Sequence, residues 1–286
     1  KETGTTGHEM VGVVRQFGST VTGLEPGELV LGLSPDHTAM SELYCAQAEN
    51  SLRLPQGRTP EEFLMAQQLG TVIYACRRLP DISGKTALVV GQGSAGLFFN
   101  SMLKRLGAKT VIATDLEQAR LDRAASFGAD RGFINGEIDP VSVAAEMTGG
   151  ELADIVVEAT GEPDAINLTP KLVKERGIIL FFGVPHQQTF PFDYFSFYRK
   201  YAHTITNSGA MGQKDKGMFV EALDLIAAGD IPAGRMITHR LPFDRLGEAY
   251  SLAQNRTDGA VKVIVEMPGA PAYRNKVIDP PQGDCE

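Results

Sequence analysis

The chain has 286 residues, 43% of them hydrophobic, which is enough for one large domain or two modest ones. Asp and Glu outnumber Lys and Arg by 35 to 27, and a net charge of −8 without basic runs argues against nucleic acid or an anionic membrane as partner. No segment approaches the roughly 20 apolar residues that cross a bilayer. The three cysteines are widely spaced and form no disulfide framework, so we expect a cytoplasmic protein. Because no Met precedes the early apolar stretch, we also expect a natural start upstream of Lys1.

Residues 8–54 have the texture of short strands joined by turns. β-rich runs at 10–14 and 29–33 are separated by Pro-Gly turn residues, and a third strand is predicted at 42–46. This first part of the chain is therefore expected to be rich in β-structure.

A helix is predicted to begin at residue 60. Thr59 is a capping residue type, Pro60 suits the first helical position, and Glu62 stands where a capping box requires an acidic side chain. Apolar residues then recur at helical spacing to about Leu79.

From Lys85 to Ser208 predicted strands alternate with predicted helices. The strands are expected at 87–90, 110–114, 131–133, 154–158, 178–184 and 204–207. Helices are expected between them, notably at 95–106 and 117–127. Several strands are continuous apolar runs, which is typical of strands covered on both faces, so the pattern predicts an α/β fold with a doubly wound parallel sheet.

After Ser208 the chain returns to a mixed texture. A helix is predicted at 216–228, ended by Gly229, and β-like pieces follow at 237–241 and 260–265. No internal repeat is visible.

A glycine-rich turn follows the first strand of the alternating region. It consists of Gly91, Gln92, Gly93, Ser94, Ala95 and Gly96. An apolar strand runs directly into Gly91, and an amphipathic helix begins straight after the turn. In such a turn the first glycine permits the bend, the second lets the backbone approach a pyrophosphate, and the third lets the helix pack close to the strand. The helix N-terminus attracts phosphate, so the pattern predicts a dinucleotide site; a glycine turn without a ligand is the alternative.

The second strand ends in Asp115, 19 residues after Gly96. A carboxylate there accepts hydrogen bonds from the adenosine ribose and repels a 2′-phosphate, which favours NAD over NADP. Arg120 lies just beyond and softens that preference if it contacts the ribose.

Several segments occur in one order along the chain. They are Gly7-His8-Glu9, the run 10–14, the turn Pro26-Gly27-Glu28 with Val30, the segment 40–44, and the glycine turn. Together they closely resemble the zinc-type alcohol dehydrogenase family of the medium-chain dehydrogenase/reductase superfamily, nearest to its sorbitol and threonine dehydrogenase branch. The resemblance extends to about Met267.

This resemblance implies two domains. A split GroES-like, β-rich catalytic domain would comprise residues 1–65 and 212–286, and a Rossmann coenzyme-binding domain would occupy 66–211 between its two parts. A homodimer or homotetramer is also implied.

The family's site residues carry over onto four positions of the catalytic side. His8 matches a ligand of the catalytic zinc, with Glu9 as a neighbour that can approach the metal, and Thr71 matches the threonine beside the nicotinamide ring. Gln67 occupies the place of the third ligand, where a neutral amide binds zinc poorly. The first ligand, a Cys, would precede Lys1, so a catalytic zinc is left open; the four-cysteine lobe of a structural zinc has no counterpart.

Further coenzyme contacts are implied where the fourth and fifth sheet strands end. Thr160 and the pair Gly183-Val184 match backbone positions that meet the nicotinamide ribose and carboxamide, and Lys262 matches a basic residue near the pyrophosphate. Lys262 as an ordinary surface lysine is the alternative.

We therefore expect an NAD(H)-dependent oxidoreductase acting on a small alcohol or polyol and its carbonyl partner, with or without zinc. One alternative is a zinc-free reductase like the quinone-reductase branch. The other is a dinucleotide-binding protein without catalysis.

Overall fold

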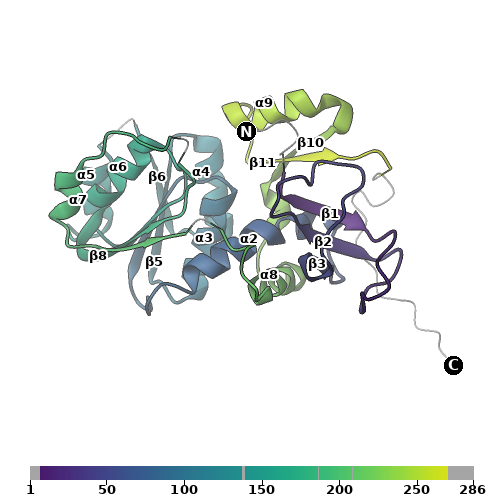
Figure 1. Cartoon of the computed structure of the whole chain (residues 1–286). Coiled ribbons are helices and arrows are strands. Elements are labelled where there is room, and N and C mark those ends of the chain that lie inside the picture. Colours follow the sequence, from purple (N-terminus) through teal and green to yellow (C-terminus); the bar gives the residue numbers. More distant parts are fainter. Residues whose placement is uncertain (1–6, 137–138, 186, 208, 270–286) are drawn as a thin grey trace. The chain divides into compact units, whose positions relative to one another are not determined.

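A computed structural model describes residues 7–136, 139–185, 187–207 and 209–269 (Figure 1). They divide into two compact units, one within Lys1–Thr71 and Ala210–Glu286 and the other comprising Val72–Gly209. Within the ranges described, no helix is both long and apolar enough to cross a membrane.

The unit of residues 72–209 is built on a six-stranded sheet. Its strands are β4 (Thr86–Val90), β5 (Thr110–Asp115), β6 (Arg131–Ile134), β7 (Ala153–Glu158), β8 (Val173–Phe181) and β9 (His203–Thr206). They lie in the order β6-β5-β4-β7-β8-β9, and every neighbouring pair is parallel. The chain reverses its direction of progress between β4 and β7, which is where ligands bind in sheets of this kind. The predicted doubly wound parallel sheet is confirmed.

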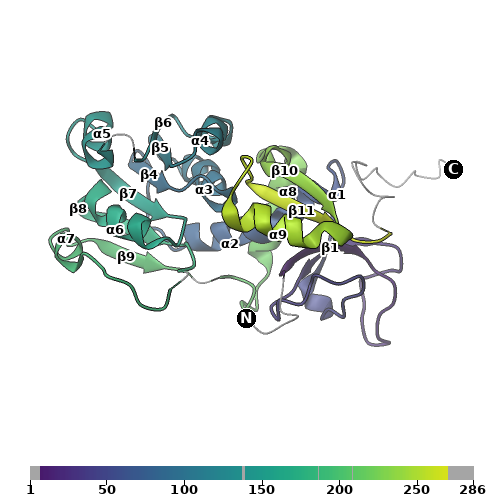
Figure 2. The same cartoon turned by 90° about the horizontal axis from the view of Figure 1, so that it is seen from above.

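Helices cover both faces of this sheet (Figures 1 and 2). They are α3 (Ser94–Arg105), α4 (Gln118–Ala124), α5 (Pro140–Met147), α6 (Pro163–Leu172) and the short α7 (Tyr194–Tyr198), with a 3₁₀ turn at Ala125–Phe127. α3 and α4 lie on one face, and α5 and α6 lie on the other.

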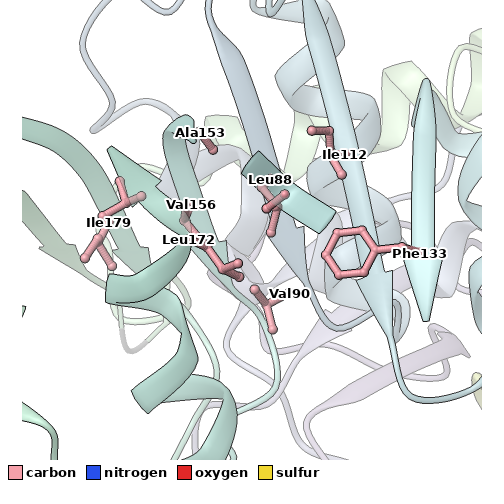
Figure 3. Close-up of a cluster of buried hydrophobic side chains, with 10 residues drawn as sticks. Leu88, Val90, Ile112, Phe133, Ala153, Val156, Leu172 and Ile179 are labelled. Atoms are coloured by element: carbon pink, nitrogen blue, oxygen red, sulfur yellow. The ribbon is translucent and has the colours of Figure 1, made fainter. Parts of the chain in front are cut away.

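The alternation of side chains along β4 explains the two cores. Leu88 and Val90 belong to a buried cluster that includes Ala144 of α5 and Leu172 of α6, and Figure 3 shows the neighbouring strands contributing to it. Val89, one residue out of phase, faces Gly96 of α3. Successive side chains of a strand point to opposite faces, so a continuous apolar run is required here.

The other unit contains two smaller sheets. Strands β1 (Glu9–Val13), β2 (Leu29–Leu33) and β3 (Ser51–Arg53) form an antiparallel sheet, and β10 (Ile237–Pro242) pairs in parallel with β11 (Lys262–Glu266). Its helices are α1 (Pro60–Leu64), α8 (Gly217–Ala228) and α9 (Leu246–Asn255), with 3₁₀ turns at Ala48–Asn50, Ala233–Met236 and Phe243–Arg245. α2 (Ala66–Cys76) contains the boundary between the units, which falls after Thr71.

The strand predicted at 42–46 is wrong, and β3 is the third strand instead. Side-chain hydrogen bonds explain the difference. Ser41 donates to the carbonyl oxygen of Leu43 at 3.0 Å, and the Tyr44 hydroxyl donates to Asp36 at 2.8 Å. Such local bonds compete with the ladder and fold the segment into a loop.

The helix predicted from residue 60 to 79 is two helices. The capping box is present as predicted, since Glu62 N–H donates to Thr59 Oγ1 and Thr59 N–H donates to Glu62 Oε2. Met65 interrupts the helix because its N–H bonds to the carbonyl of Glu62, three residues back. That tighter turn is 3₁₀ in character.

The fifth strand of the sheet also differs from its prediction at 178–184. β8 begins at Val173 and ends at Phe181. A register shift, with Ala153 opposite Val173 but Ile155 opposite Ile178, extends the strand at its start. At its end, the N–H groups of Phe182 and Gly183 both bond to the carbonyl of Glu158, which turns the chain away from the ladder.

Candidate coenzyme site

The glycine turn lies at the carboxyl end of β4, beside the point where the strand order reverses. Gly91 has a φ of +92°, which a glycine adopts without cost, and its N–H donates to the Thr114 carbonyl at 2.8 Å. Gly93 is the N-cap of α3 and makes no side-chain cap. The first amides of α3 have no intrahelical acceptor, and together with the helix dipole they form an anion-binding position.

The three glycines of the turn meet different surroundings. A Cβ atom on Gly96 would lie 1.8 Å from the Gly91 carbonyl oxygen, and one on Gly91 would lie 2.3 Å from Thr160 Cγ2. A Cβ on Gly93 would meet nothing within 4 Å. Gly91 and Gly96 are therefore required by the protein's own packing, whereas Gly93 leaves open space over the turn. This arrangement fits a pyrophosphate, as the sequence predicts.

Asp115 ends β5, the strand next to the turn. Its Oδ2 accepts the Gln92 N–H at 2.5 Å and its Oδ1 accepts the Glu117 N–H at 2.9 Å. These bonds hold the carboxylate beside the glycine turn, at the place predicted for the adenosine ribose. Arg120 lies five residues further on in α4 and is buried.

Gln92 is used inside the protein. Its side chain is fully buried, its Nε2 donates to the Val89 carbonyl at 3.1 Å, and its Oε1 accepts from Asn100 Nδ2 at 2.7 Å. The backbone N–H of Gln92 donates to Asp115, and its side chain bonds to Val89 and Asn100. All three bonds stabilise the conformation of the glycine turn from within the protein. Ser94 and Ala95, also predicted to bind the coenzyme, are the first two residues of α3.

The ends of β7 and β8 approach each other closely. A Cβ on Gly183 would lie 2.0 Å from the Gly161 nitrogen, and one on Gly161 would lie 2.2 Å from the Val184 carbonyl oxygen. Thr160 stands in the same turn, with its methyl group against Gly91, and the Val184 side chain is exposed. The structure thus brings Thr160 and Gly183 together with the glycine turn at one edge of the sheet.

Sequence analysis missed Glu158 as a site residue. It is the last residue of β7, it is fully buried, and its Oε1 accepts hydrogen bonds from the backbone and hydroxyl of Thr160. A carboxylate at the end of an otherwise apolar buried strand was the available signal, because such a group is rarely buried without partners.

The residues predicted for catalysis lie in the other unit. Glu9, at the start of β1, forms an ion pair with Lys262 of β11, and both side chains are largely buried. The ring centroid of His8 lies 4.8 Å from that of His37 in an edge-to-face arrangement. Gln67 is buried in α2, and its backbone carbonyl accepts a hydrogen bond from the Thr71 hydroxyl at 3.2 Å.

His37, whose ring contacts that of His8, lies in a loop at 34–44 that is held by side-chain hydrogen bonds. Asp36 accepts from the hydroxyl groups of Ser34, Thr38 and Tyr44, and these bonds hold the pKa of its carboxyl well below the usual value. His37 itself has a φ of +61°. Among residues 7–136, 139–185, 187–207 and 209–269, no three His, Cys, Asp or Glu side chains stand close enough to hold a metal ion.

Known proteins are similar to this chain in sequence and in fold. Residues 95–228 match the zinc-binding dehydrogenase family. A sorbitol dehydrogenase from Bombyx mori is 25% identical over 91% of this chain and 81% of its own length, and an alcohol dehydrogenase from Cupriavidus necator is 26% identical over 92% and 84%. The solved alcohol dehydrogenase TADH from Thermus sp. ATN1 has a TM-score of 0.79 at 25% identity, covering 90% of this chain and 82% of its own.

The matches agree with the glycine turn, the parallel sheet and the order of motifs along the chain. The chain is therefore similar to the zinc-type alcohol dehydrogenases of the medium-chain dehydrogenase/reductase superfamily, and these relatives support an oxidoreductase of the alcohol dehydrogenase type.

Proposed function

We propose that this protein transfers hydride between NAD(H) and a small alcohol or polyol and the corresponding ketone or aldehyde. The observation that carries the proposal is the glycine turn, where Gly91 and Gly96 are fixed by packing and Gly93 leaves space for a phosphate. A bound NAD would supply the hydride acceptor for oxidation of the carbinol carbon of the alcohol, with release of the hydroxyl proton as the carbonyl forms.

The protein's own part in this chemistry is to bind and orient the coenzyme. The amides at the start of α3 would meet the pyrophosphate, and Asp115 would accept hydrogen bonds from the adenosine ribose. Its negative charge disfavours a 2′-phosphate, so we propose NAD as the main coenzyme, with Arg120 as the nearby residue that would moderate this preference. Thr160, Gly183 and Val184 would meet the nicotinamide ribose and carboxamide.

The donor set in the described ranges does not fit a catalytic zinc. Glu9 is engaged by the Lys262 ammonium, and Gln67 offers a neutral amide. Of the two residues at the ligand positions implied by the family, His8 and Gln67, only His8 has a side chain that commonly binds zinc. The proposed hydride transfer therefore involves no metal. The proposed roles of His8, Glu9, Gln67, Thr71 and Lys262 rest on the family resemblance.

Other features of the proposal come from the family as well. We propose that residues 1–65 and 212–286 form the GroES-like catalytic domain and that 66–211 form the Rossmann domain. We also propose a cytoplasmic homodimer or homotetramer. The exposed aromatic side chains of α7, Tyr194, Phe195 and Tyr198, would suit a subunit contact.

Calorimetric titration with NADH, followed by a panel of alcohols and polyols with NAD, tests the proposal. We expect NADH to bind and at least one alcohol to be oxidised with formation of NADH. If neither NADH nor NADPH produces heat of binding, the redox function is wrong.

A second candidate is a dinucleotide-binding protein without catalysis. The burial of Glu9 against Lys262 and the presence of Gln67 favour it, because both reduce the ligands available for metal chemistry. Tight NADH binding without turnover over the whole panel would support this candidate. A zinc-free reductase would instead reduce activated double bonds with NADH.

A further inference from the structure

The Glu158 carboxylate is buried at the end of β7 and gathers several donors on one oxygen. Its Oε1 accepts from Thr160 N–H at 2.7 Å, Thr160 Oγ1 at 2.6 Å and Gly161 N–H at 3.0 Å. The side chain is completely shielded from solvent. Because moving a carboxylate out of water is costly, these bonds must hold it firmly in place.

The main chain of Glu158 holds the neighbouring strand end. Its carbonyl accepts from Phe182 N–H at 2.9 Å and from Gly183 N–H at 3.1 Å. The same residue therefore fixes the turn that follows β7 and the end of β8, which are the two segments predicted to meet the nicotinamide half of the coenzyme.

Thr160 connects this carboxylate to the glycine turn. Its hydroxyl donates to Glu158 and accepts from Glu162 N–H at 2.9 Å, so both sides of the oxygen are engaged. With the hydroxyl fixed, the methyl group is directed at Gly91, where it would come within 2.3 Å of a Cβ. Glu158 thus reaches the phosphate-binding turn through the methyl group of Thr160.

We propose that Glu158 is a positioning residue for the coenzyme: its carboxylate orients Thr160, whose methyl group sets the position of Gly91 in the phosphate-binding turn. This inference rests on the proposed function. A buried polar group that only stabilises the sheet would contact the core alone. Glu158 instead bonds to Thr160, and Thr160 contacts the glycine turn that would bind the coenzyme.

Two conservative changes at Thr160 separate the parts of this route. T160S keeps the hydroxyl that bonds to Glu158 and removes the methyl group that contacts Gly91, whereas T160V keeps a methyl group and removes the hydroxyl. E158Q keeps an oxygen acceptor in nearly the same volume and removes the charge. The full chain is used throughout, and the dissociation constants of NADH, ADP-ribose and adenosine are measured with the melting temperature of the free protein.

We expect each single change to weaken the binding of NADH and ADP-ribose by about fivefold, the scale of one lost close contact or hydrogen bond. Adenosine, which lacks phosphate and is measured by competition with NADH, should bind as it does to the wild type. A role in stability alone would lower the melting temperature and leave the affinity for the intact coenzyme unchanged, which would overturn the proposal.

The double variant E158Q/T160S provides the decisive comparison. If Glu158 acts through the methyl group, E158Q should weaken NADH binding less than twofold once that group is absent, because coupled residues are not additive. Fully additive losses would contradict the proposed route. If E158Q does not fold, loss of NADH affinity in T160V, which lacks the hydroxyl that donates to Glu158, with an unchanged melting temperature still supports the inference. Wild-type affinity in T160V overturns it. Failure of the wild type itself to bind NADH would instead reject the proposed function.

Discussion

The glycines of the glycine turn differ in what constrains them. Gly96 is held by its approach to the Gly91 carbonyl, whereas Gly93 faces open space. A methyl group is therefore tolerated by the fold at Gly93 but not at Gly96. Substitution at Gly96 therefore tests the packing of the protein, whereas substitution at Gly93 tests the binding of a ligand over the turn.

For Gly93→Ala we expect an unchanged melting temperature and NADH binding weakened by about tenfold or more, because the methyl group occupies space that the pyrophosphate needs. For Gly96→Ala we expect a loss of about 1–3 kcal/mol in the free energy of unfolding, as in other overpacked sites, together with weak binding. Thermal melts and NADH titration measure both. Wild-type affinity in Gly93→Ala would show that the coenzyme does not lie over this turn.

Asp115 is expected to choose between the two nicotinamide coenzymes. In Asp115→Asn the charge that repels a 2′-phosphate is removed, so the ratio of NADP to NAD affinity should rise by about tenfold. Asp122→Asn is the matched control, since it removes the same charge from the exposed face of α4. An equal change of the ratio in both variants would mean that Asp115 acts only through net charge.

Sequence reasoning identified the glycine turn because each of its constraints is local. The strand, the three glycines and the following helix are adjacent in the chain, so their pattern is visible without the fold. Glu158 escaped because its importance depends on the packing of β7 beside β4, which brings Thr160 against Gly91, 69 positions away in the chain. The internal partners of Gln92 were invisible for the same reason.

At the scale of secondary-structure elements, the alternation of strand and helix patterns located the six strands of the large sheet. Continuous apolar runs mark its inner strands, because a strand buried on both faces leaves little place for polar residues. The outermost strands, β6 and β9, are short and carry exposed polar residues. The strand predicted at 42–46 is wrong because hydrogen bonds of the Ser41 and Tyr44 side chains hold these β-prone residues in a loop. The break at Met65 and the bulge at the start of β8 also depend on hydrogen bonds that apolar periodicity does not report.

Near the start of β7, the ionisable side chain of Asp154 bonds to both neighbouring strands, so the strength of these bonds depends on pH. Asp154 accepts from the Thr86 N–H at the start of β4 and pairs with Lys174 of β8. Burial alone raises the pKa of Asp154, but the bonds from Lys174 and Thr86 outweigh it, so the pKa lies below its usual value. A lowered carboxyl pKa means that the stabilisation is present above the unfolded pKa and is lost as the pH falls through the folded one.

We therefore expect Asp154→Asn to lower the free energy of unfolding by about 1.5–3 kcal/mol near neutral pH, the range for a hydrogen bond to a charged group. As the pH falls below the usual Asp pKa of about 4, the wild type should lose this advantage and approach the variant. Urea unfolding at several pH values measures the difference. A gap between the two proteins that stays constant down to strongly acid pH would contradict the assignment.

At the scale of the whole molecule, alternation of strands and helices was sufficient to predict the architecture of the unit of residues 72–209. Parallel strands need crossover helices, and the right-handed rule leaves few arrangements for them. In the other unit, β-prone runs predicted the positions of β1, β2, β10 and β11, but not which strands pair, because pairing partners have no signature in the local sequence. The ion pair between Glu9 and Lys262 joins residues 253 positions apart and has no local signature.

Removal of metal ions tests whether coenzyme binding by this protein depends on a metal. In the proposed site the turn amides and Asp115 would hold the coenzyme without a metal, so dialysis against a chelator should leave the NADH dissociation constant unchanged. The stabilisation by NADH should also persist, at about 2.7 kcal/mol when its concentration is a hundred times the dissociation constant. Elemental analysis before dialysis should find less than about one tenth of an equivalent of zinc, far below the one ion per chain that a catalytic site holds. Turnover that disappears on chelation and returns with added zinc would contradict this expectation and would require metal donors beyond those in the described ranges.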